Sequence, residues 1–227
     1  MLEDNKFRIP RIWSNRELKK FAKLFRGTVV NVSGWKDIDK EGANYRDYFV
    51  NASEYWITNY RSEARGFQGD QENEIFLDLT KPVPDGLPRY DVVFNHTVLE
   101  HIFEVETAFS NLCLLSKDVV IVVVPFLQEQ HADYGDYWRF TPLALDKLFK
   151  KNGLTTVYIN ANDHADASIY VFAIASRFPG NWKEIGNHED NMLEFLGQEK
   201  GMIGRRVIRN SVWTALMSKM LNKITQF

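Results

Sequence analysis

Two loops carry the residues of this sequence that are best suited to chemistry. His131 and His164 each begin a His-Ala-Asp triplet, and an imidazole titrates close enough to neutrality to act as the general base of a hydroxyl. Asp133 and Asp166 could orient an imidazole, or the four side chains could together gather a divalent metal. No spacing enforces that metal site, so we predict no metal and assign both histidines to catalysis. The alternative for each histidine is a solvated loop residue.

The first triplet opens a loop that is rich in aromatic and charged side chains. Aromatic rings can stack on a sugar face, and a guanidinium fork suits an anionic glycan or nucleotide sugar. We therefore predict that four residues contact the substrate: Asp133, Tyr134, Tyr137 and Arg139. The alternative is that Trp138 and Phe140 anchor the loop in the core while Arg139 braces it.

A strand and a helix position this loop. Val119–Val124 is an unbroken apolar run, which is typical of a strand covered on both faces. Pro125 cannot donate a ladder hydrogen bond, so we expect the strand to end there. Thr141 and Pro142 predict an N-cap followed by proline at the first helical position. Since open α/β sheets bind ligands at the carboxyl ends of their strands, the loop is a candidate site.

The rest of the chain alternates between strands and amphipathic helices. We expect further strands at 28–32, 54–60, 74–80, 90–95, 155–160 and 169–176. A first helix is expected to begin at a Ser14/Glu17 capping box and to end at Gly27. A second helix contains the apolar stripe Val105, Phe109 and Leu112, and a third covers 141–152 and ends before Gly153. This order predicts an α/β fold with a mostly parallel sheet and helices on both faces. The short connection at 161–168 predicts an antiparallel hairpin at one edge of the sheet.

Composition sets limits on the class of protein. The chain has 227 residues, is 44% hydrophobic and carries a net charge of −2, so it can bury a real core and gives no electrostatic case for nucleic acid. Cys113 is the only cysteine, which excludes an intrachain disulfide. We find no apolar signal core and no apolar run of membrane-spanning length, and we therefore expect a cytoplasmic protein.

We divide the chain into an N-terminal arm and helix at 1–27, a main domain at 28–177 and a C-terminal helical appendage at 178–227. From Lys200 onward there are six basic residues and no acidic residue. A basic amphipathic helix of this kind can pack on its own domain or on a second subunit, or lie on an anionic membrane surface. Own-domain packing, a homodimer and peripheral contact at the inner face of the membrane therefore all stay open.

Three stretches of the main domain resemble class I S-adenosylmethionine-dependent methyltransferases, in particular the small domains common in bacterial glycan gene clusters. Residues 90–102 (YDVVFNHTVLEHI) look like the fourth strand of the family and the turn after it, and residues 119–126 (VVIVVVPF) look like its fifth strand. Residues 131–154 resemble its DYWRFTP loop and the helix behind that loop. The similarity covers 28–177, about two thirds of the chain, and implies a Rossmann-like fold.

The resemblance also implies that S-adenosylmethionine binds at the carboxyl ends of the first four strands. The implied contacts are Asn31 and Gly34 at the methionine part, Asn59 at the ribose, Asp78 and Leu79 at the adenine, and Asn95 and His96 below the methyl group. This sequence departs from the family, whose first strand ends in an acid and a GxGxG-like loop. Here the segment Asn31–Lys36 reads NVSGWK, and an amide replaces the usual acid of the second strand.

Methyl transfer from a sulfonium needs alignment of the two reactants, and a hydroxyl acceptor also needs a base. The resemblance thus implies O-methylation of a sugar, nucleotide sugar or glycan precursor, with His131 or His164 as the base. The altered Asn31–Lys36 segment supports an alternative, a catalytically inactive binding or scaffold subunit. A nucleotide-binding enzyme of other chemistry is a third reading, although the sequence has neither a Walker loop nor GxGxxG.

Overall fold

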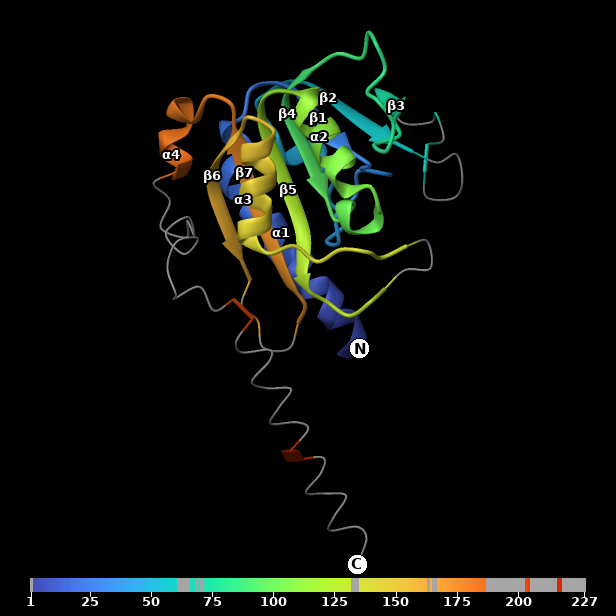
Figure 1. Cartoon of the computed structure of the whole chain (residues 1–227), viewed down its shortest axis with the longest axis vertical. Coiled ribbons are helices and arrows are strands. Elements are labelled where there is room, and N and C mark those ends of the chain that lie inside the picture. Colours follow the sequence, from blue (N-terminus) through green and yellow to red (C-terminus); the bar gives the residue numbers. More distant parts are fainter. Residues whose placement is uncertain are drawn as a thin grey trace, which may run out of the picture.

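The computed structural model describes residues 2–60, 66, 67, 69, 72–131, 135–162, 164, 167–186, 203, 204, 216 and 217. Its centre is a seven-stranded sheet with the order β3-β2-β1-β4-β5-β7-β6 (Figure 1). The strands are β1 (Gly27–Val32), β2 (Ala52–Asn59), β3 (Glu74–Phe76), β4 (Tyr90–His96), β5 (Ser116–Leu127), β6 (Thr155–Ala161) and β7 (Ile169–Ser176). The first five strands are parallel, whereas β7 is antiparallel to both β5 and β6. The predicted parallel sheet with an antiparallel edge hairpin is confirmed.

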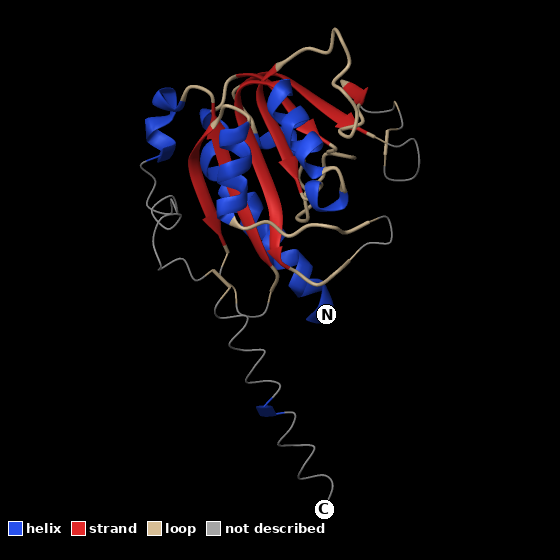
Figure 2. Cartoon of the chain, viewed as in Figure 1, coloured by secondary structure: helices blue, strands red, loops and turns tan. Residues whose placement is uncertain are grey.

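Helices cover both faces of the sheet (Figure 2). The described helices are α1 (Leu2–Phe21), α2 (Val105–Leu115), α3 (Pro142–Lys151) and the short α4 (Lys183–Gly186), with 3-10 turns η1 (Ala22–Leu24), η2 (Tyr45–Tyr48), η3 (Leu99–His101) and η4 (Pro179–Trp182). Within β5, Val120 and Val122 face the core beneath α2 and α3, while Val119 and Ile121 face the core beneath α1. This alternation explains the unbroken apolar run, because both faces of β5 are buried.

The first helix differs from its prediction. It begins at Leu2 and continues past Ser14, so Ser14 is an interior residue rather than an N-cap. The Ser14 hydroxyl donates to the carbonyl of Arg11 at 2.9 Å and lies 2.8 Å from His96 Nε2. The Glu17 carboxylate accepts a hydrogen bond from the Tyr158 hydroxyl at 2.5 Å. The Ser/Glu spacing that suggested a capping box therefore places two polar groups of α1 against the sheet.

The expectation that Pro125 ends the fifth strand was also wrong, since β5 continues to Leu127. The carbonyls of Val123 and Pro125 accept hydrogen bonds from the amides of Thr97 and Phe140 at 2.8 and 2.9 Å. Both carbonyls thus point away from β7, and the β4 ladder stops at Val123. The missing amide hydrogen of Pro125 therefore falls beyond the end of β4, where no ladder partner is lost.

Other boundaries follow from local hydrogen bonds. The Thr141 hydroxyl caps α3 by accepting from the Ala144 amide at 3.1 Å, and Gly153 follows α3 with a φ of +73°, both as predicted. The predicted strand at 74–80 is shortened to three residues, because Asp78 caps a turn through Thr80. Gly27 begins β1 instead of ending a helix.

No helix within the described residues has the length and apolar character to cross a membrane. Most of the predicted C-terminal appendage lies outside the described residues, including nearly all of the basic helix and any contact it makes with a second subunit or a membrane. The division of the chain at residues 27 and 177 stays a prediction.

Candidate functional site at the carboxyl edge of the sheet

The loop after β1 keeps an unusual backbone path. Ser33, Trp35 and Asp37 all have left-handed φ angles, of 58°, 49° and 59°, a conformation that costs a residue other than glycine about 1–2 kcal/mol. Gly34 lies between them, and a Cβ at this position would come within 2.6 Å of Asn31 Cγ. The glycine is thus required for its close approach to Asn31, while three larger residues take the left-handed positions.

A buried carboxylate holds this loop in place. Asp37 is 2% exposed and accepts hydrogen bonds from the Asn31 amide at 2.8 Å, the Tyr55 hydroxyl at 2.7 Å and the Arg46 backbone amide at 3.0 Å. The network offsets the backbone strain, because such conformations persist only where the surroundings determine them. Asn31, predicted as a cofactor contact, therefore bonds to Asp37 of the loop itself.

Asn59 also bonds to the loop. Its side-chain oxygen accepts from the Trp35 amide at 2.7 Å, and its nitrogen donates to the Trp35 carbonyl at 3.2 Å and to Glu74 at 2.6 Å. The Trp35 indole is 40% exposed, with the Lys36 ammonium 5.4 Å from its ring centroid. The Trp35 side chain is therefore only partly covered by the protein.

The two predicted adenine contacts differ in exposure. Asp78 is half-buried, and one of its carboxylate oxygens accepts from the amide and the hydroxyl of Thr80 at 2.8 and 2.7 Å. Leu79 is 3% exposed and belongs to the core beneath α2 and α3. Its backbone carbonyl accepts a hydrogen bond from the Asn111 amide at 2.8 Å. The side chain of Leu79 is thus a core residue.

The end of β4 carries two polar side chains, of which Asn95 is buried and His96 is half-buried. Asn95 donates from Nδ2 to the Val32 carbonyl at 3.0 Å, joining β4 to β1, while its buried Oδ1 has no hydrogen-bond partner. His96 lies against Ser14 of α1 and the ring of Tyr45. Burial, reinforced by the nearby Arg11 cation, lowers the pKa of His96 to about 3. His96 is therefore neutral at physiological pH.

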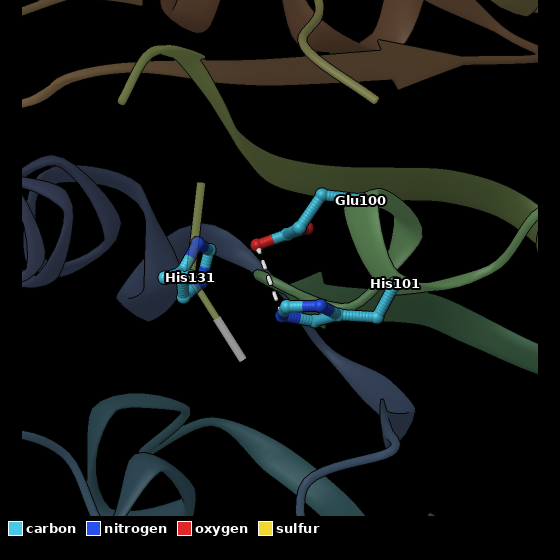
Figure 3. Close-up of side chains that lie close together, drawn as sticks. All are labelled: Glu100, His101 and His131. Atoms are coloured by element: carbon cyan, nitrogen blue, oxygen red, sulfur yellow. Dashed lines mark ion pairs between the residues drawn. The ribbon is translucent and has the colours of Figure 1, made fainter. Parts of the chain in front are cut away.

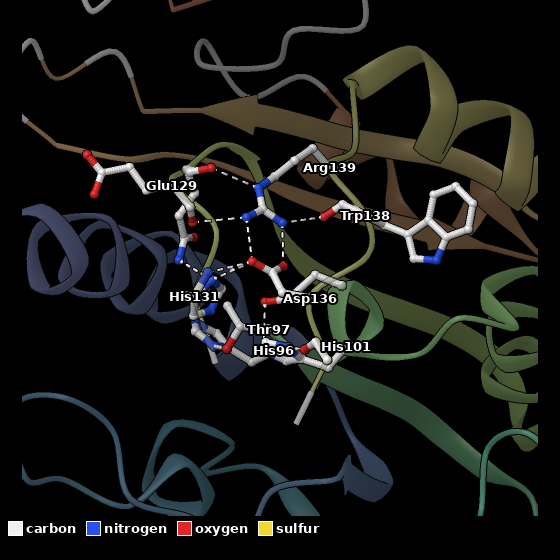
Figure 4. Close-up of polar contacts among 11 residues, drawn as sticks. His96, Thr97, His101, Glu129, His131, Asp136, Trp138 and Arg139 are labelled. Atoms are coloured by element: carbon white, nitrogen blue, oxygen red, sulfur yellow. Dashed lines mark hydrogen bonds and ion pairs between the residues drawn. The ribbon is translucent and has the colours of Figure 1, made fainter. Parts of the chain in front are cut away.

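An ion pair fixes His131 in the loop after β5 (Figure 4). The Arg139 guanidinium donates to both carboxylate oxygens of Asp136, at 2.5 and 2.7 Å. These bonds hold the pKa of Asp136 well below its usual range. Asp136 Oδ2 in turn lies 2.7 Å from the backbone nitrogen and 3.1 Å from Nδ1 of His131. The side-chain nitrogen of Gln128 also lies 3.1 Å from His131 Nδ1. The ionised Asp136 beside Nδ1 favours the tautomer that carries its hydrogen on Nδ1 and its lone pair on Nε2.

Arg139 has further partners within its own loop. It donates to the backbone carbonyls of Gln128 and Glu129, both at 3.0 Å. The guanidinium predicted to contact substrate is therefore the centre of the loop's own network. From the sequence we considered Asp133 as a residue that could orient an imidazole. In the part of the chain that the structure describes, the carboxylate beside His131 is that of Asp136.

Glu100 and His101 lie in the η3 turn after β4 (Figure 3). From the sequence we favoured a structural role for this pair, ordering the turn, and did not assign it to the site. Glu100 is fully buried and neither of its carboxylate oxygens has a hydrogen-bond partner. Burial raises the pKa of Glu100 to about 8. His101 Nδ1 lies 2.6 Å from the Gly135 carbonyl, and its Nε2 lies 3.8 Å from Glu100 Oε1. The segment HTVLEH directly after a buried strand was the sequence signal for this pair.

Helix α1 lies over the same edge and contributes three side chains. Phe7 has its ring centroid 6.0 Å from that of His131, Arg11 hydrogen-bonds the Tyr170 hydroxyl of β7, and Ser14 contacts His96. The spacing of 7, 11 and 14 places them on one helical face. The N-terminal segment expected to be an arm thus supplies part of the site.

The remaining predicted residues are placed as follows. His164 is exposed, in the connection between β6 and β7. Because Ile169 of β7 pairs with Leu127 of β5, this connection lies at the same edge of the sheet as the His131 loop. Tyr137 is 52% exposed, with its ring centroid 5.4 Å from that of Phe103. Asp133, Tyr134 and Asp166 lie outside the described residues.

Two aromatic side chains of this loop have different surroundings. Phe140 is 4% exposed and belongs to the core beneath α2 and α3, as the anchoring alternative predicted. The Trp138 indole nitrogen donates to the carbonyls of Ile102 and Phe103 at 3.0 and 3.2 Å. These two bonds tie the His131 loop to the turn after β4.

Comparison with solved structures identifies the fold. The chain is similar to a magnesium protoporphyrin IX methyltransferase from Synechocystis with bound S-adenosylmethionine (TM-score 0.51, 14% identity, 74% of this chain and 79% of that chain). It is also similar to an S-adenosylmethionine-dependent methyltransferase from Clostridium acetobutylicum (0.51, 8%, 74% and 91%) and to an O-methyltransferase family protein from Burkholderia thailandensis (0.52, 12%, 75% and 56%). No protein-family model and no curated protein matches the sequence. At these identities the likeness establishes the class I methyltransferase fold.

Proposed function

We propose that this protein is an S-adenosylmethionine-dependent methyltransferase that acts on an oxygen of a sugar, nucleotide sugar or glycan precursor. The observation that carries the proposal is the position of His131. Its imidazole is oriented by the Asp136–Arg139 ion pair at the carboxyl edge of a class I methyltransferase fold. In open α/β sheets this edge is where ligands bind.

The residues at the ends of β1 and β4 fit the cofactor. The buried Oδ1 of Asn95 has no partner, and buried polar atoms without partners are rare in native proteins. The left-handed residues after β1 keep the chain close to the sheet, while the Trp35 indole is partly exposed. We therefore assign cofactor binding to this edge, with Gly34, Asn95 and His96 at the methionine side and Asn59, Asp78 and Leu79 at the nucleoside side. When bound, the cofactor supplies an electrophilic methyl group.

The side chains of this protein would align the acceptor and take its proton. His131 Nε2 holds the lone pair that accepts the hydroxyl proton, and ionised Asp136 stabilises the resulting imidazolium. His96 does not serve as the base, because a pKa of about 3 makes it a weak proton acceptor and its two ring nitrogens face the hydroxyls of Ser14 and Thr97. We assign the sugar face to the exposed ring of Tyr137, together with Asp133 and Tyr134. Arg139, predicted as a further contact, supports this loop instead, because its five N–H groups donate to Asp136 and to three backbone carbonyls. His164 is the second candidate base.

Transfer of a radiolabelled methyl group from S-adenosylmethionine to a panel of nucleotide sugars and oligosaccharides tests this proposal. His131→Gln and His164→Gln form a matched pair. We expect His131→Gln to lower the rate by about 10²–10⁴-fold, the contribution of a positioned base, with a much smaller loss for His164→Gln. The reverse order would assign the base to His164.

Two negative results have different meanings. Cofactor binding without transfer to any sugar-type acceptor would reject the acceptor class. Absence of cofactor binding would reject the methyltransferase itself and would favour a scaffold subunit.

A further inference from the structure

We propose that Glu100, His101 and His131 form a binding site for a divalent transition-metal ion of the class that imidazole and carboxylate ligands favour, such as Zn²⁺ or Mn²⁺. The three side chains come from two segments that are distant in sequence, the η3 turn after β4 and the loop after β5. One ligand atom from each lies within 4.8 Å of the other two (Figure 3). The metal set considered from the sequence included His131 but not Glu100 or His101.

The carboxylate of Glu100 is the first reason for this assignment. It is fully buried, with no hydrogen-bond partner for either oxygen. A buried carboxylate in a native protein is paired, protonated or bound to a metal. One of its oxygens faces His101 Nε2 at 3.8 Å, so the unsatisfied group is directed at an imidazole that could share a cation with it.

The tautomers of the two imidazoles are the second reason. His101 Nδ1 donates to the Gly135 carbonyl at 2.6 Å, and His131 Nδ1 faces the ionised Asp136 at 3.1 Å. The carbonyl partner places the lone pair of His101 on Nε2, and the ionised Asp136 favours the same tautomer in His131. Nε2 is the atom of each ring that would bind a metal. Histidine ligands almost always donate their other ring hydrogen to a carbonyl or carboxylate in this way. The ring centroids of His101 and His131 are 5.0 Å apart.

The distances and charges set the character of the site. Zinc binds imidazole nitrogen at about 2.0–2.1 Å, so two of its ligand atoms lie no more than about 4 Å apart. The separations of up to 4.8 Å therefore require an inward movement of roughly 1 Å. His131 lies on a loop and its side chain is 23% exposed, and its movement toward the other two ligands has to carry Asp136 with it or lengthen the 3.1 Å contact between them. Arg11 is a cation close to Glu100 and lowers the expected affinity for a metal.

Three protein ligands leave a coordination position open, as in catalytic rather than structural zinc sites. If the proposed function holds, an acceptor hydroxyl could occupy that position, where a cation would lower its pKa. His131 would then act on the acceptor through the cation rather than as a free base. This consequence rests on the proposed function, whereas the metal site itself does not.

Metal binding to the chelator-treated, full-length protein tests the inference. Titrations with Zn²⁺ and Mn²⁺ are followed by calorimetry, and Co²⁺ by its visible absorption. We expect one ion per chain for the wild type and for the exposed control Asp85→Asn. For Glu100→Gln and His101→Gln we expect at least ~10-fold weaker binding, since even outer-shell changes cost 10–100-fold. Circular dichroism verifies the folding of each variant.

Two outcomes would overturn the site: no stoichiometric binding to the wild type, or equal affinity in all four proteins. The Co²⁺ spectrum of the wild type provides a readout that does not depend on whether the variants fold. Calorimetry with S-adenosylhomocysteine on the same samples reports separately on the proposed function. A failure of one inference is thereby distinguishable from a failure of the other.

Discussion

The half-buried histidine at the end of β4, His96, predicts a specific dependence of stability on acid. His96 is enclosed by Ser14 of α1, by Tyr45 and by Phe94, with ring centroids 5.7 and 6.0 Å away. Burial, followed by the charge of Arg11, lowers its pKa from 6.5 to about 3. Protonation of His96 in the folded protein is therefore unfavourable, whereas in the unfolded chain it occurs below pH 6.5.

The size of the effect follows from proton linkage. Between pH 6.5 and pH 3 the unfolded state binds more protons at this site than the folded state does, so the free energy of unfolding rises with pH in that range. The stability is present above pH 6.5 and is lost as the pH falls, at about 1.4 kcal/mol per pH unit. At pH 5 the loss due to His96 is about 2 kcal/mol.

Urea unfolding at pH 7.5 and pH 5.0, with chelator present, measures this loss. His96→Gln removes the titrating group, and His164→Gln is the control because His164 is exposed. We expect the wild type and His164→Gln to lose about 2 kcal/mol more than His96→Gln between the two pH values. An equal loss in all three proteins would refute the reasoning, whatever the absolute stability of His96→Gln.

Two further substitutions test the site and the loop that supports it. Asp136→Asn removes the charge beside His131, and we expect methyl transfer to fall by about 10–100-fold with unchanged affinity for S-adenosylhomocysteine. Asp85→Asn, at an exposed position, is the control. A loss of cofactor affinity in Asp136→Asn as large as its loss of methyl transfer would contradict a positioning role. Gly34→Ala places a Cβ 2.6 Å from Asn31, and we expect thermal or urea unfolding to show a loss of about 1–3 kcal/mol. Gly180→Ala is the control, because a Cβ at this position meets no atom within 4 Å, and it should change the free energy of unfolding by less than about 0.5 kcal/mol. An equally small change in Gly34→Ala would show that the loop can rearrange to accommodate the Cβ.

The sequence was most informative where local signals and burial agree. The run Val119–Val124 predicted a doubly covered strand, and the Thr141 cap and Gly153 fixed the ends of α3. The beginning of α1 could not be predicted, because Pro10 and a charged composition conceal the helix and because its buried polar residues find partners far along the chain. Glu17, for example, bonds to Tyr158.

The candidate site, too, could be predicted only in part. The loop and His131 were predicted from residue type, but the carboxylate that orients His131 was not. Asp133 is closer to His131 in sequence, whereas Asp136 is held beside it by the Arg139 fork. The proximity of Glu100 and His101 to His131 depends on the parallel pairing of β4 with β5, which brings the carboxyl ends of the two strands together. No spacing in the sequence reveals it.

Calorimetric titration with S-adenosylhomocysteine tests the central claim most directly, that the carboxyl edge formed by β1 and β4 binds an adenosyl cofactor. We predict saturable binding of one molecule per chain, weakened at least ~10-fold by Asn95→Leu, which removes the unpaired buried oxygen. The absence of binding heat at millimolar ligand, for a wild-type protein shown to be folded, would contradict the account.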